Sequence, residues 1–367
     1  MAKTKITIAI FGIGNVGSTL IDQIVKYNRA PFPFQLDIAF LANSTRYFIP
    51  HNKVTDAWRA QFAQDASNYD TEMLLSYFKT TSKQFIIVDA TASESFTDLY
   101  LSFIRAGHHI ATANKIANTR SIPSYNQLRK ELQKGNLSFE YETNVGAGLP
   151  VIQTARNFKD SQDIVKKVVG VLSGSLSYIF NTATEPDSFY ETLIDAKNQG
   201  FTEPDPRIDL SGTDVARKLL IIARELGLSL ELEEIEIQSL IPERLQTVTA
   251  SKFLNAKDAL NSHFNEYLKQ RKSDHVLRYV GELDLVTGKA AVTVKQINQN
   301  NAFAGLHHTD NLVAFYSEDY QNQPLVIQGA GAGKAVTARG LLQDVLKIAQ
   351  RHATIKNDLV PEVALVS

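Results

Sequence analysis

Short apolar runs alternate with amphipathic stretches over the first 145 residues of the chain. Each run is apolar along its whole length, which is typical of parallel strands that are buried on both faces. Between the first two runs, residues 18–26 place Leu20, Ile21 and Ile24 at helical spacing. Strands that alternate with helices predict βαβ units and a doubly wound parallel sheet. The expected strands are residues 6–11, 36–41, 85–90, 109–113 and 137–142.

The pattern changes near residue 166 to longer β-rich runs that are interrupted by helical stretches. Thr287-Gly288 separates two of these runs and is a hairpin signal. The second part of the chain is therefore expected to have an α+β fold. Its expected elements are helices at 189–198 and 212–226, and strand pairs at 277–285 with 290–297 and at 312–317 with 325–328.

A last helical pattern at 336–351 follows a glycine run, and we expect this C-terminal helix to return to the first domain. The pattern divides the chain into residues 1–145, residues 146–328, and a glycine loop with its helix at residues 329–367. Within that last segment, residues 357–367 are expected to form a frayed tail.

Length and composition narrow the classes of function. The chain has 367 residues, enough for two domains, because single cores seldom grow beyond about 250–300 residues. Lys and Arg (38) balance Asp and Glu (39), so no net field favours nucleic acid or an anionic membrane. The absence of cysteine excludes disulfides and thiolate chemistry, and it suits the cytoplasm. No apolar run approaches the roughly 20 residues of a membrane span, and no signal peptide is recognisable.

A glycine motif follows the first expected strand and opens the first helix. It reads Gly12, Ile13, Gly14, Asn15, Val16 and Gly17. Glycines at these spacings allow a tight turn, close approach of the main chain to a pyrophosphate, and close helix packing. The helix N-terminus attracts the anion. The first domain is therefore expected to be a Rossmann-type domain that binds NADP or NAD.

The end of the second expected strand lacks the acidic residue that binds the ribose 2′-hydroxyl in NAD-preferring sites. That end carries Asn43, Ser44 and Arg46, and the nearest acid, Asp37, comes too early in the strand. A missing carboxylate together with Arg46 favours a 2′-phosphate and hence NADP. The alternative is that Arg46 is a solvated loop residue.

The densest polar cluster of the chain lies at residues 200–218. Two prolines keep its first half out of helix, and Asp209 or Ser211 could cap the helix that follows. Asp214 and Lys218 are spaced i,i+4 and would share one helical face. Such a cluster can bind one substrate at two points: the carboxylates bind its ammonium group, and the lysine contacts its reacting oxygen. An exposed salt bridge with a capping box is the alternative interpretation.

Three segments, at residues 141–150, 172–180 and 203–218, resemble homoserine dehydrogenase in order and spacing. The likeness extends from the first strand to the terminal helix. It implies reversible NAD(P)-dependent interconversion of L-homoserine and L-aspartate 4-semialdehyde, within threonine and methionine biosynthesis. It also implies that the second domain is catalytic and forms a homodimer, as expected for a β-rich lobe with many apolar faces.

The resemblance also implies roles for individual residues. Lys218 would be the acid/base at the reacting oxygen, and Lys115 would lie near the nicotinamide and the substrate. One difference is Ile208, where relatives often carry a second Asp. The implied substrate-binding residues are Glu203, Asp214, Asp209, Gly174 and Ser175. The glycine motif and the end of the second strand predict cofactor contacts at Gly12, Gly14, Asn15, Val16, Gly17, Asn43, Ser44 and Arg46. The resemblance adds Thr91, Ala92, Ser93, Lys115 and Gly333. The main-chain carbonyls of Glu142, Val145, Ala147 and Leu149 would hold a monovalent cation, Na⁺ or K⁺.

Some relatives carry an aspartokinase before this unit or a regulatory domain after it. The glycine motif begins at Gly12 and only about 16 residues follow Arg351, so we expect a monofunctional enzyme without threonine inhibition through such a domain. Two other functions remain open. One is an oxidoreductase for another small polar substrate, and the other is a catalytically silent NADP-binding sensor. Activity on a panel of substrates would distinguish the first from a homoserine dehydrogenase. The presence of both Lys115 and Lys218 argues against the second.

Overall fold

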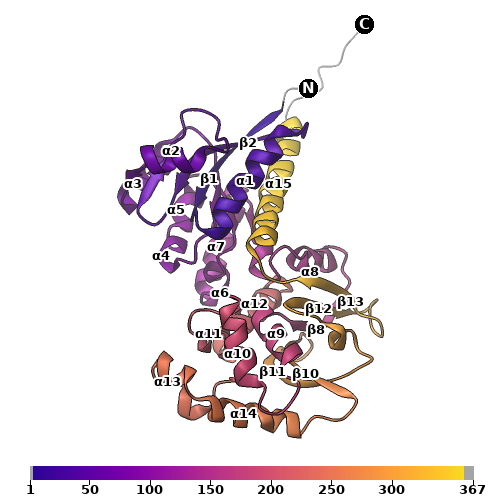
Figure 1. Cartoon of the computed structure of the whole chain (residues 1–367). Helices are drawn as coiled ribbons and strands as arrows, with labels where there is room; N and C mark the ends of the chain where they lie inside the picture. The colour runs from indigo at the N-terminus through magenta and orange to yellow at the C-terminus, as the bar shows by residue number, and fades with distance from the viewer. Residues whose placement is uncertain (1–2, 359–367) are drawn as a thin grey trace. The chain divides into compact units, whose positions relative to one another are not determined.

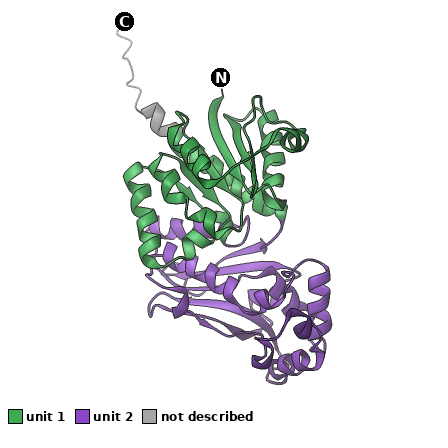
Figure 2. Cartoon of the chain, turned by 90° about the vertical axis from the view of Figure 1, so that its left-hand side faces the viewer, with its two compact units in different colours: residues 1–144, 334–367 green, residues 145–333 purple. Residues whose placement is uncertain are grey.

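The structure is a computed structural model that describes residues 3–358, with side chains described as far as residue 352. The chain forms two compact units (Figure 2). Unit 1 comprises residues 1–144 and 334–367, and unit 2 comprises residues 145–333. Residues 359–367, most of the tail that we expect to fray, lie outside the described residues.

Unit 1 is built on a seven-stranded sheet of order β4-β3-β2-β1-β5-β6-β7. From β2 to β7 all pairings are parallel, which confirms the predicted sheet. The strand order reverses at β1, and doubly wound sheets bind ligands beyond the carboxyl ends at such a point. The antiparallel strands β3 and β4 were not predicted, because two- and three-residue strands show no periodicity. The strands are β1 (Thr4–Phe11), β2 (Phe34–Ala42), β3 (Arg46–Phe48), β4 (Ser67–Asn68), β5 (Ile86–Asp89), β6 (His109–Thr112) and β7 (Phe139–Glu140).

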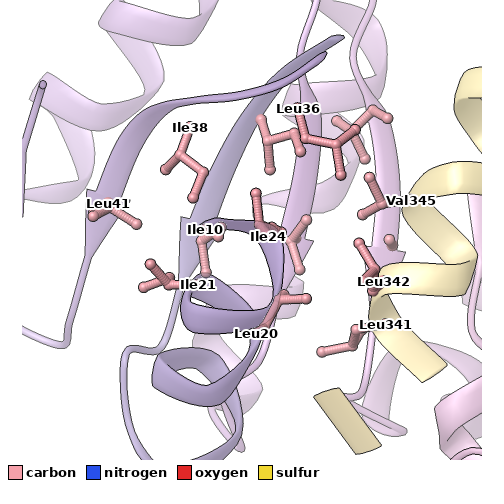
Figure 3. Packing of buried hydrophobic residues seen from close by; sticks show 14 of the residues in the cluster. Ile10, Leu20, Ile21, Ile24, Leu36, Ile38, Leu41, Leu341, Leu342 and Val345 are labelled. Carbon is pink, nitrogen blue, oxygen red and sulfur yellow. The ribbon is translucent and has the colours of Figure 1, made fainter. Parts of the chain in front are cut away.

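The C-terminal helix packs on unit 1, as the sequence predicts. Leu20 and Ile24 of α1 share one buried cluster with Leu342 and Val345 of α15 (Figure 3). All four side chains are almost fully buried, and each such burial contributes about 1.5–3 kcal/mol. The helices are α1 (Asn15–Arg29), α2 (Trp58–Asp65), α3 (Thr71–Thr80), α4 (Glu94–Thr97), α5 (Tyr100–Arg105), α6 (Ile116–Thr119), α7 (Ile122–Gly135), the 3-10 turn η1 (Glu142–Asn144) and α15 (Lys334–Asp358).

Unit 2 has the predicted α+β fold (Figure 1). Its six-stranded sheet has the order β13-β12-β8-β10-β11-β9, and β10 and β11 form the hairpin predicted at Thr287-Gly288. The strands are β8 (Val165–Val171), β9 (Glu236–Ile237), β10 (His275–Asp284), β11 (Lys289–Asn298), β12 (Asp310–Ser317) and β13 (Leu325–Ala330). The helices are α8 (Val151–Asp160), α9 (Gly174–Thr182), α10 (Phe189–Asn198), α11 (Arg207–Leu210), α12 (Thr213–Glu225), α13 (Ala250–Leu254) and α14 (Lys257–Lys269).

A search for membrane spans among the described residues finds no helix with the length and apolarity to cross a bilayer.

Candidate functional site

The glycine motif forms the turn between β1 and α1, and its three glycines are needed for different reasons. Gly12 has φ +86°, a conformation that favours glycine. A Cβ at Gly17 would lie 1.9 Å from the Gly12 carbonyl oxygen, whereas a Cβ at Gly14 would meet nothing within 4 Å. Gly14 is the N-cap of α1 and makes no side-chain capping bond, so the helix start, with Asn15 and Val16, is open to an anion. The turn fits a dinucleotide pyrophosphate.

The end of β2 leads into a turn that Asn43 closes. The Asn43 Oδ1 accepts hydrogen bonds from the main-chain N–H groups of Thr45 (2.9 Å) and Arg46 (2.7 Å), while Ser44 is exposed. The Arg46 guanidinium donates to the Ala66 carbonyl at 2.6 and 3.1 Å and to the Ala63 carbonyl at 3.2 Å, at the carboxyl end of α2. Arg46 is therefore held in place by α2 and is not a freely solvated loop residue.

The acidic side chain nearest to this turn in sequence is directed to another partner. Asp37 lies in the middle of β2, opposite Thr7 of β1, and its carboxylate pairs with Lys5 at 3.0 Å. No acid follows β2 at the position of a ribose-binding carboxylate, in agreement with the sequence prediction.

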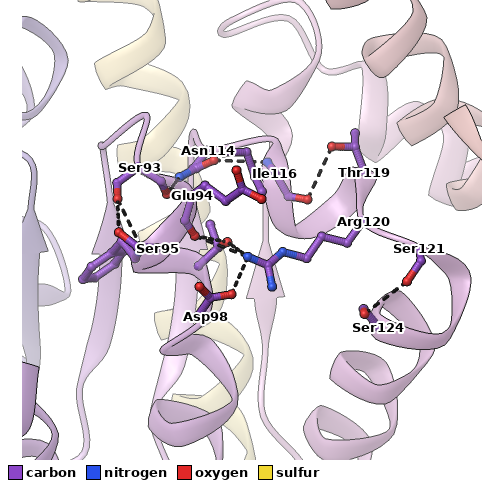
Figure 4. Close-up of polar contacts among 12 residues, drawn as sticks. Ser93, Glu94, Ser95, Asp98, Asn114, Ile116, Thr119, Arg120, Ser121 and Ser124 are labelled. Atoms are coloured by element: carbon purple, nitrogen blue, oxygen red, sulfur yellow. Dashed lines mark hydrogen bonds and ion pairs between the residues drawn. The ribbon is translucent and has the colours of Figure 1, made fainter.

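The loops after β5 and β6 carry the other predicted cofactor contacts of unit 1. Ser93 caps α4 by accepting a hydrogen bond from the Phe96 N–H at 3.2 Å, and Ala92 beside it is exposed. The Asn114 amide donates to the Ser93 carbonyl at 2.9 Å and accepts from the Ile116 N–H at 3.1 Å (Figure 4). Lys115 lies between these two anchors as the half-buried N-cap of α6.

A buried acid at the end of β5 was not among the predicted site residues. Asp89 is fully buried, and it accepts hydrogen bonds from the Tyr100 hydroxyl at 2.6 Å and the Thr91 N–H at 2.7 Å. Burial is the main cause of a raised pKa for this carboxyl. The signal in the sequence is an acid that ends an apolar strand directly before Ala90 and Thr91.

Lys218 lies on α12 in unit 2 and is buried. Its ammonium donates to the Leu172 carbonyl at 2.7 Å and pairs with Asp214 Oδ2 at 2.8 Å. The predicted i,i+4 pair is therefore confirmed. An ammonium has three N–H donors, and these partners take two of them.

Asp209 joins two predicted substrate segments of unit 2. Its Oδ1 accepts from the Ser175 hydroxyl at 2.8 Å, and its Oδ2 accepts from the Glu203 N–H at 2.9 Å. Burial is the main cause of a raised pKa for Asp209. The N-cap of α12 is Gly212, with φ +77°, so neither Asp209 nor Ser211 occupies that position. Of the two caps that the sequence allows, Asp209 does not serve, because its oxygens are engaged elsewhere. The Ser211 hydroxyl instead accepts from the Thr213 N–H at 3.2 Å, at the first residue of α12.

The start of α9 brings two more predicted residues into unit 2. Gly174 and Ser175 are buried, directly after the N-cap Ser173. A Cβ at Gly174 would lie 3.2 Å from the Thr309 carbonyl oxygen and 3.6 Å from the Ala332 Cβ. Gly174 therefore lets the helix start approach another main-chain segment closely.

The predicted cation ligands lie on a buried turn. Gly146 has φ +75° and Ala147 has φ +55°, a strained conformation for a residue with a Cβ. Glu142, Val145 and Ala147 are buried, and Leu149 is half-buried. Main-chain carbonyl oxygens are suitable ligands for a hard cation. Among the described residues, no cluster of three His, Asp or Glu side chains offers an alternative metal site.

Gly333, the last predicted cofactor contact, has φ +125° and directly precedes α15. It is exposed, and only glycine adopts such a conformation readily.

Comparisons with protein families and known proteins identify the family of this chain. The family model described as homoserine dehydrogenase matches residues 150–346, and the model of the homoserine dehydrogenase NAD-binding domain matches residues 12–142. Over 95% of its length the chain is 38% identical to the bifunctional aspartokinase/homoserine dehydrogenase of Haemophilus influenzae. It is 36% identical, again over 95%, to the chloroplastic bifunctional aspartokinase/homoserine dehydrogenase 1 of Arabidopsis thaliana. The chain spans only 43% and 39% of those two proteins.

Solved structures share the fold. A Candida auris protein of unknown function is 34% identical, with a TM-score of 0.87 over 95% of this chain and 99% of that one. A hyperthermophilic archaeal homoserine dehydrogenase in complex with NADPH is 20% identical, with a TM-score of 0.74 over 95% and 98%.

Proposed function

The chain belongs to the homoserine dehydrogenase family, and from this premise we propose that it interconverts L-homoserine and L-aspartate 4-semialdehyde with a nicotinamide cofactor. The observation that carries the proposal is the buried Lys218 ammonium, which Asp214 and the Leu172 carbonyl hold in one orientation. A surface salt bridge would leave the lysine exposed, whereas this lysine is only 8% exposed.

Lys218 is the proposed acid/base. In aldehyde reduction its ammonium donates a proton to the oxygen that becomes the alkoxide, and in alcohol oxidation its amine takes the hydroxyl proton. A positive charge at that oxygen also stabilises the charge that develops there. The bound nicotinamide supplies or accepts the hydride.

The carboxylates around Lys218 bind and orient the substrate. Glu203 and Asp214 are assigned to the homoserine amino group and hydroxyl region. Asp209 holds the Glu203 segment against Ser175, so that the substrate-binding residues keep their spacing. Gly174 lets the start of α9 pack closely against Thr309, and main-chain N–H groups at a helix start attract an anionic group.

The cofactor is proposed to be NADP in preference to NAD. The turn of Asn43, Ser44 and Arg46 lacks a carboxylate that would repel a 2′-phosphate, and it offers a hydroxyl and a cation instead. Gly12, Gly14 and Gly17 hold the pyrophosphate. The loop of Thr91, Ala92 and Ser93, with Lys115 and Gly333, is assigned to the nicotinamide half, and the turn at residues 142–149 to Na⁺ or K⁺.

Three further features belong to the proposal. The enzyme acts as a homodimer, because its β-rich unit is of the kind that pairs in two-fold assemblies. It works in the cytoplasm, consistent with a chain that lacks cysteine. Its product serves threonine and methionine biosynthesis.

Homoserine oxidation with NADP and NAD side by side tests the proposal. We expect reduced nicotinamide to form with homoserine and not with sugars or other amino acids, and faster with NADP. Turnover of a different polar substrate would identify another oxidoreductase. Cofactor binding without turnover of any substrate would identify a sensor.

A further inference from the structure

A buried chain of hydrogen bonds crosses the carboxyl ends of β5 and β6, and the proposed function gives it no role. Asp89, Tyr100 and Thr112 are at most 1% exposed. The Tyr100 hydroxyl donates to Asp89 Oδ2 at 2.6 Å and lies 2.8 Å from Thr112 Oγ1. The Asn114 N–H donates to Thr112 Oγ1 at 2.9 Å.

The number of donors fixes the direction of this chain when Asp89 is ionised. Tyr100 has one hydroxyl hydrogen, and it points to Asp89, so the Thr112 hydroxyl must donate to Tyr100. Thr112 in turn accepts from the Asn114 N–H. Hydrogen bonds that run in one direction polarise and strengthen one another in a buried setting. The position of Asn114 is thus set by an acid on the neighbouring strand.

The same network reaches two loops assigned to the cofactor. On the β5 side, Asp89 Oδ1 accepts from the Thr91 N–H at 2.7 Å. On the β6 side, the Asn114 amide holds the Ser93 carbonyl at 2.9 Å and the Ile116 N–H at 3.1 Å (Figure 4). Lys115 lies between Asn114 and Ile116 in the chain, so these hydrogen bonds hold the main chain on both sides of it.

Thr112 also anchors the segment that follows Glu142. Its carbonyl accepts from the Asn144 amide at 2.9 Å and from the Thr143 hydroxyl at 3.2 Å. Apolar side chains at these buried positions would fill the space without the cost of burying a carboxylate. The polar network instead holds three segments in fixed positions: the loop after β5, the loop after β6, and the turn that follows Glu142.

We propose that Asp89, Tyr100 and Thr112 are positioning residues that hold the Ser93 loop and Lys115 in the geometry that binds and orients the nicotinamide half of the cofactor. The identity of that ligand rests on the proposed function. None of the three needs to touch the cofactor, because each acts through Asn114 or through the main chain of Thr91.

Hydroxyl deletions at Tyr100 and Thr112 test the proposal. Tyr100→Phe keeps the ring packing, and Thr112→Val keeps the shape while removing the shared oxygen. Thr112→Ser restores that oxygen. Tyr77→Phe is the matched control, because Tyr77 is a partly buried tyrosine of unit 1 whose ring packs on Phe78 and lies outside the network. NADPH affinity is measured by fluorescence titration of the full chain, with kcat, KM and thermal stability alongside.

Tyr100→Phe and Thr112→Val are expected to weaken NADPH binding about five- to tenfold, as for loss of one net hydrogen bond. They should also lower kcat, with the KM for homoserine almost unchanged. Thr112→Ser and Tyr77→Phe should bind NADPH like the wild type. The double variant should be little worse than either single variant, because both break one chain.

Folded Tyr100→Phe and Thr112→Val proteins with wild-type NADPH affinity and kcat would overturn the proposal. If either variant fails to fold, the other variant and Thr112→Ser still decide it. The affinity titration does not depend on turnover. A wild-type chain that binds NADPH but leaves homoserine unchanged would therefore refute the proposed function and leave the positioning test intact.

Discussion

A single carboxylate organises the predicted substrate residues of unit 2. Asp209 takes a hydroxyl from α9 and a main-chain N–H from the Glu203 loop, two segments that are 28 residues apart at Ser175 and Glu203. Asp205, four residues earlier, instead forms a two-point pair with Arg207. The two acids of this loop therefore differ in role. Asp209 connects the predicted substrate segments, whereas Asp205 stabilises the loop through Arg207.

We expect Asp209→Asn to lower kcat/KM for homoserine by about tenfold or more, because an amide cannot accept both hydrogen bonds without turning an N–H toward one of the donors. NADPH affinity should stay unchanged. Steady-state kinetics with a cofactor titration provides the measurement. Asp205→Asn is the matched control and should lower thermal stability while kcat/KM is retained. Equal losses of kcat/KM in both variants would mean that the loop fold matters and Asp209 has no special role.

The sequence predicts a contact between two residues when they are close together in the chain and share one helix. The Asp214–Lys218 pair follows from helical periodicity alone. The partners of Asp89 and Asp209 were not predictable in this way, because they lie on other elements. A local rule offered Asp209 or Ser211 as a helix cap, yet one of the two partners of Asp209, Ser175, is 34 residues away.

The turn between β1 and α1 shows why a short element can be sensitive to one methyl group. Gly17 has no space for a Cβ, whereas Gly14 faces open space at the start of a helix. Open space at an uncapped helix start is where a pyrophosphate would lie. Substitution of Gly17 should therefore affect stability, whereas substitution of Gly14 should affect cofactor binding.

Gly17→Ala should lower the melting temperature, because its Cβ would collide with the Gly12 carbonyl at 1.9 Å. Gly14→Ala should leave the melting temperature close to that of the wild type and weaken NADPH binding about tenfold or more, through loss of close approach by the ligand. Thermal denaturation and cofactor titration of both variants provide the comparison. Wild-type NADPH affinity in Gly14→Ala would mean that no pyrophosphate lies there.

Arg46 links the turn after β2 to the carboxyl end of α2, and its substitution tests both the stability of this turn and its proposed contact with the cofactor. Arg46→Ala removes hydrogen bonds to the Ala63 and Ala66 carbonyls, so stability should fall by about 1–3 kcal/mol. It should also weaken NADPH more than NADH, if the guanidinium meets the 2′-phosphate. Denaturant unfolding and paired titrations report the two effects. A loss that is the same for NADPH and NADH would restrict Arg46 to its structural contacts.

Most long elements were predictable from periodicity, but the 13-residue helix α14 (Lys257–Lys269) was not predicted, because few apolar residues lie among its polar ones. The strands and helices of the parallel sheet and the β10–β11 hairpin follow from apolar spacing and a turn signal. The short strands β3 and β4 do not, since their three and two residues depend on pairing with a neighbour.

At the scale of the whole molecule, buried histidine makes stability depend on pH. His108 is buried, its Nδ1 accepts from the Phe85 N–H at 3.2 Å, and its Nε2 lies 2.8 Å from the Phe78 carbonyl. These contacts suit the neutral ring with its hydrogen on Nε2. Burial is the main cause of a pKa lowered from the ordinary value of 6.5.

A lowered pKa in the folded state means that the unfolded chain binds the proton more readily. The contribution of neutral His108 is therefore complete above about pH 6.5 and is lost as the pH falls toward the folded-state pKa. We expect the melting temperature to drop between about pH 7.5 and pH 5.5, and to drop less in His108→Gln. His51→Gln, at an exposed histidine, should follow the wild type. An unchanged acid slope in His108→Gln would exclude this histidine as the cause.

We propose that the chain acts as a homoserine dehydrogenase in which Lys218 moves the proton. The most direct measurement is the oxidation of NADPH by aspartate 4-semialdehyde, followed for the wild type and for Lys218→Ala, with homoserine quantified at the end. We expect one homoserine per NADPH in the wild type and a fall in kcat of about two to four orders of magnitude in the variant, with NADPH affinity unchanged. A wild type that binds NADPH without forming homoserine, or a variant that turns over normally, would contradict this account.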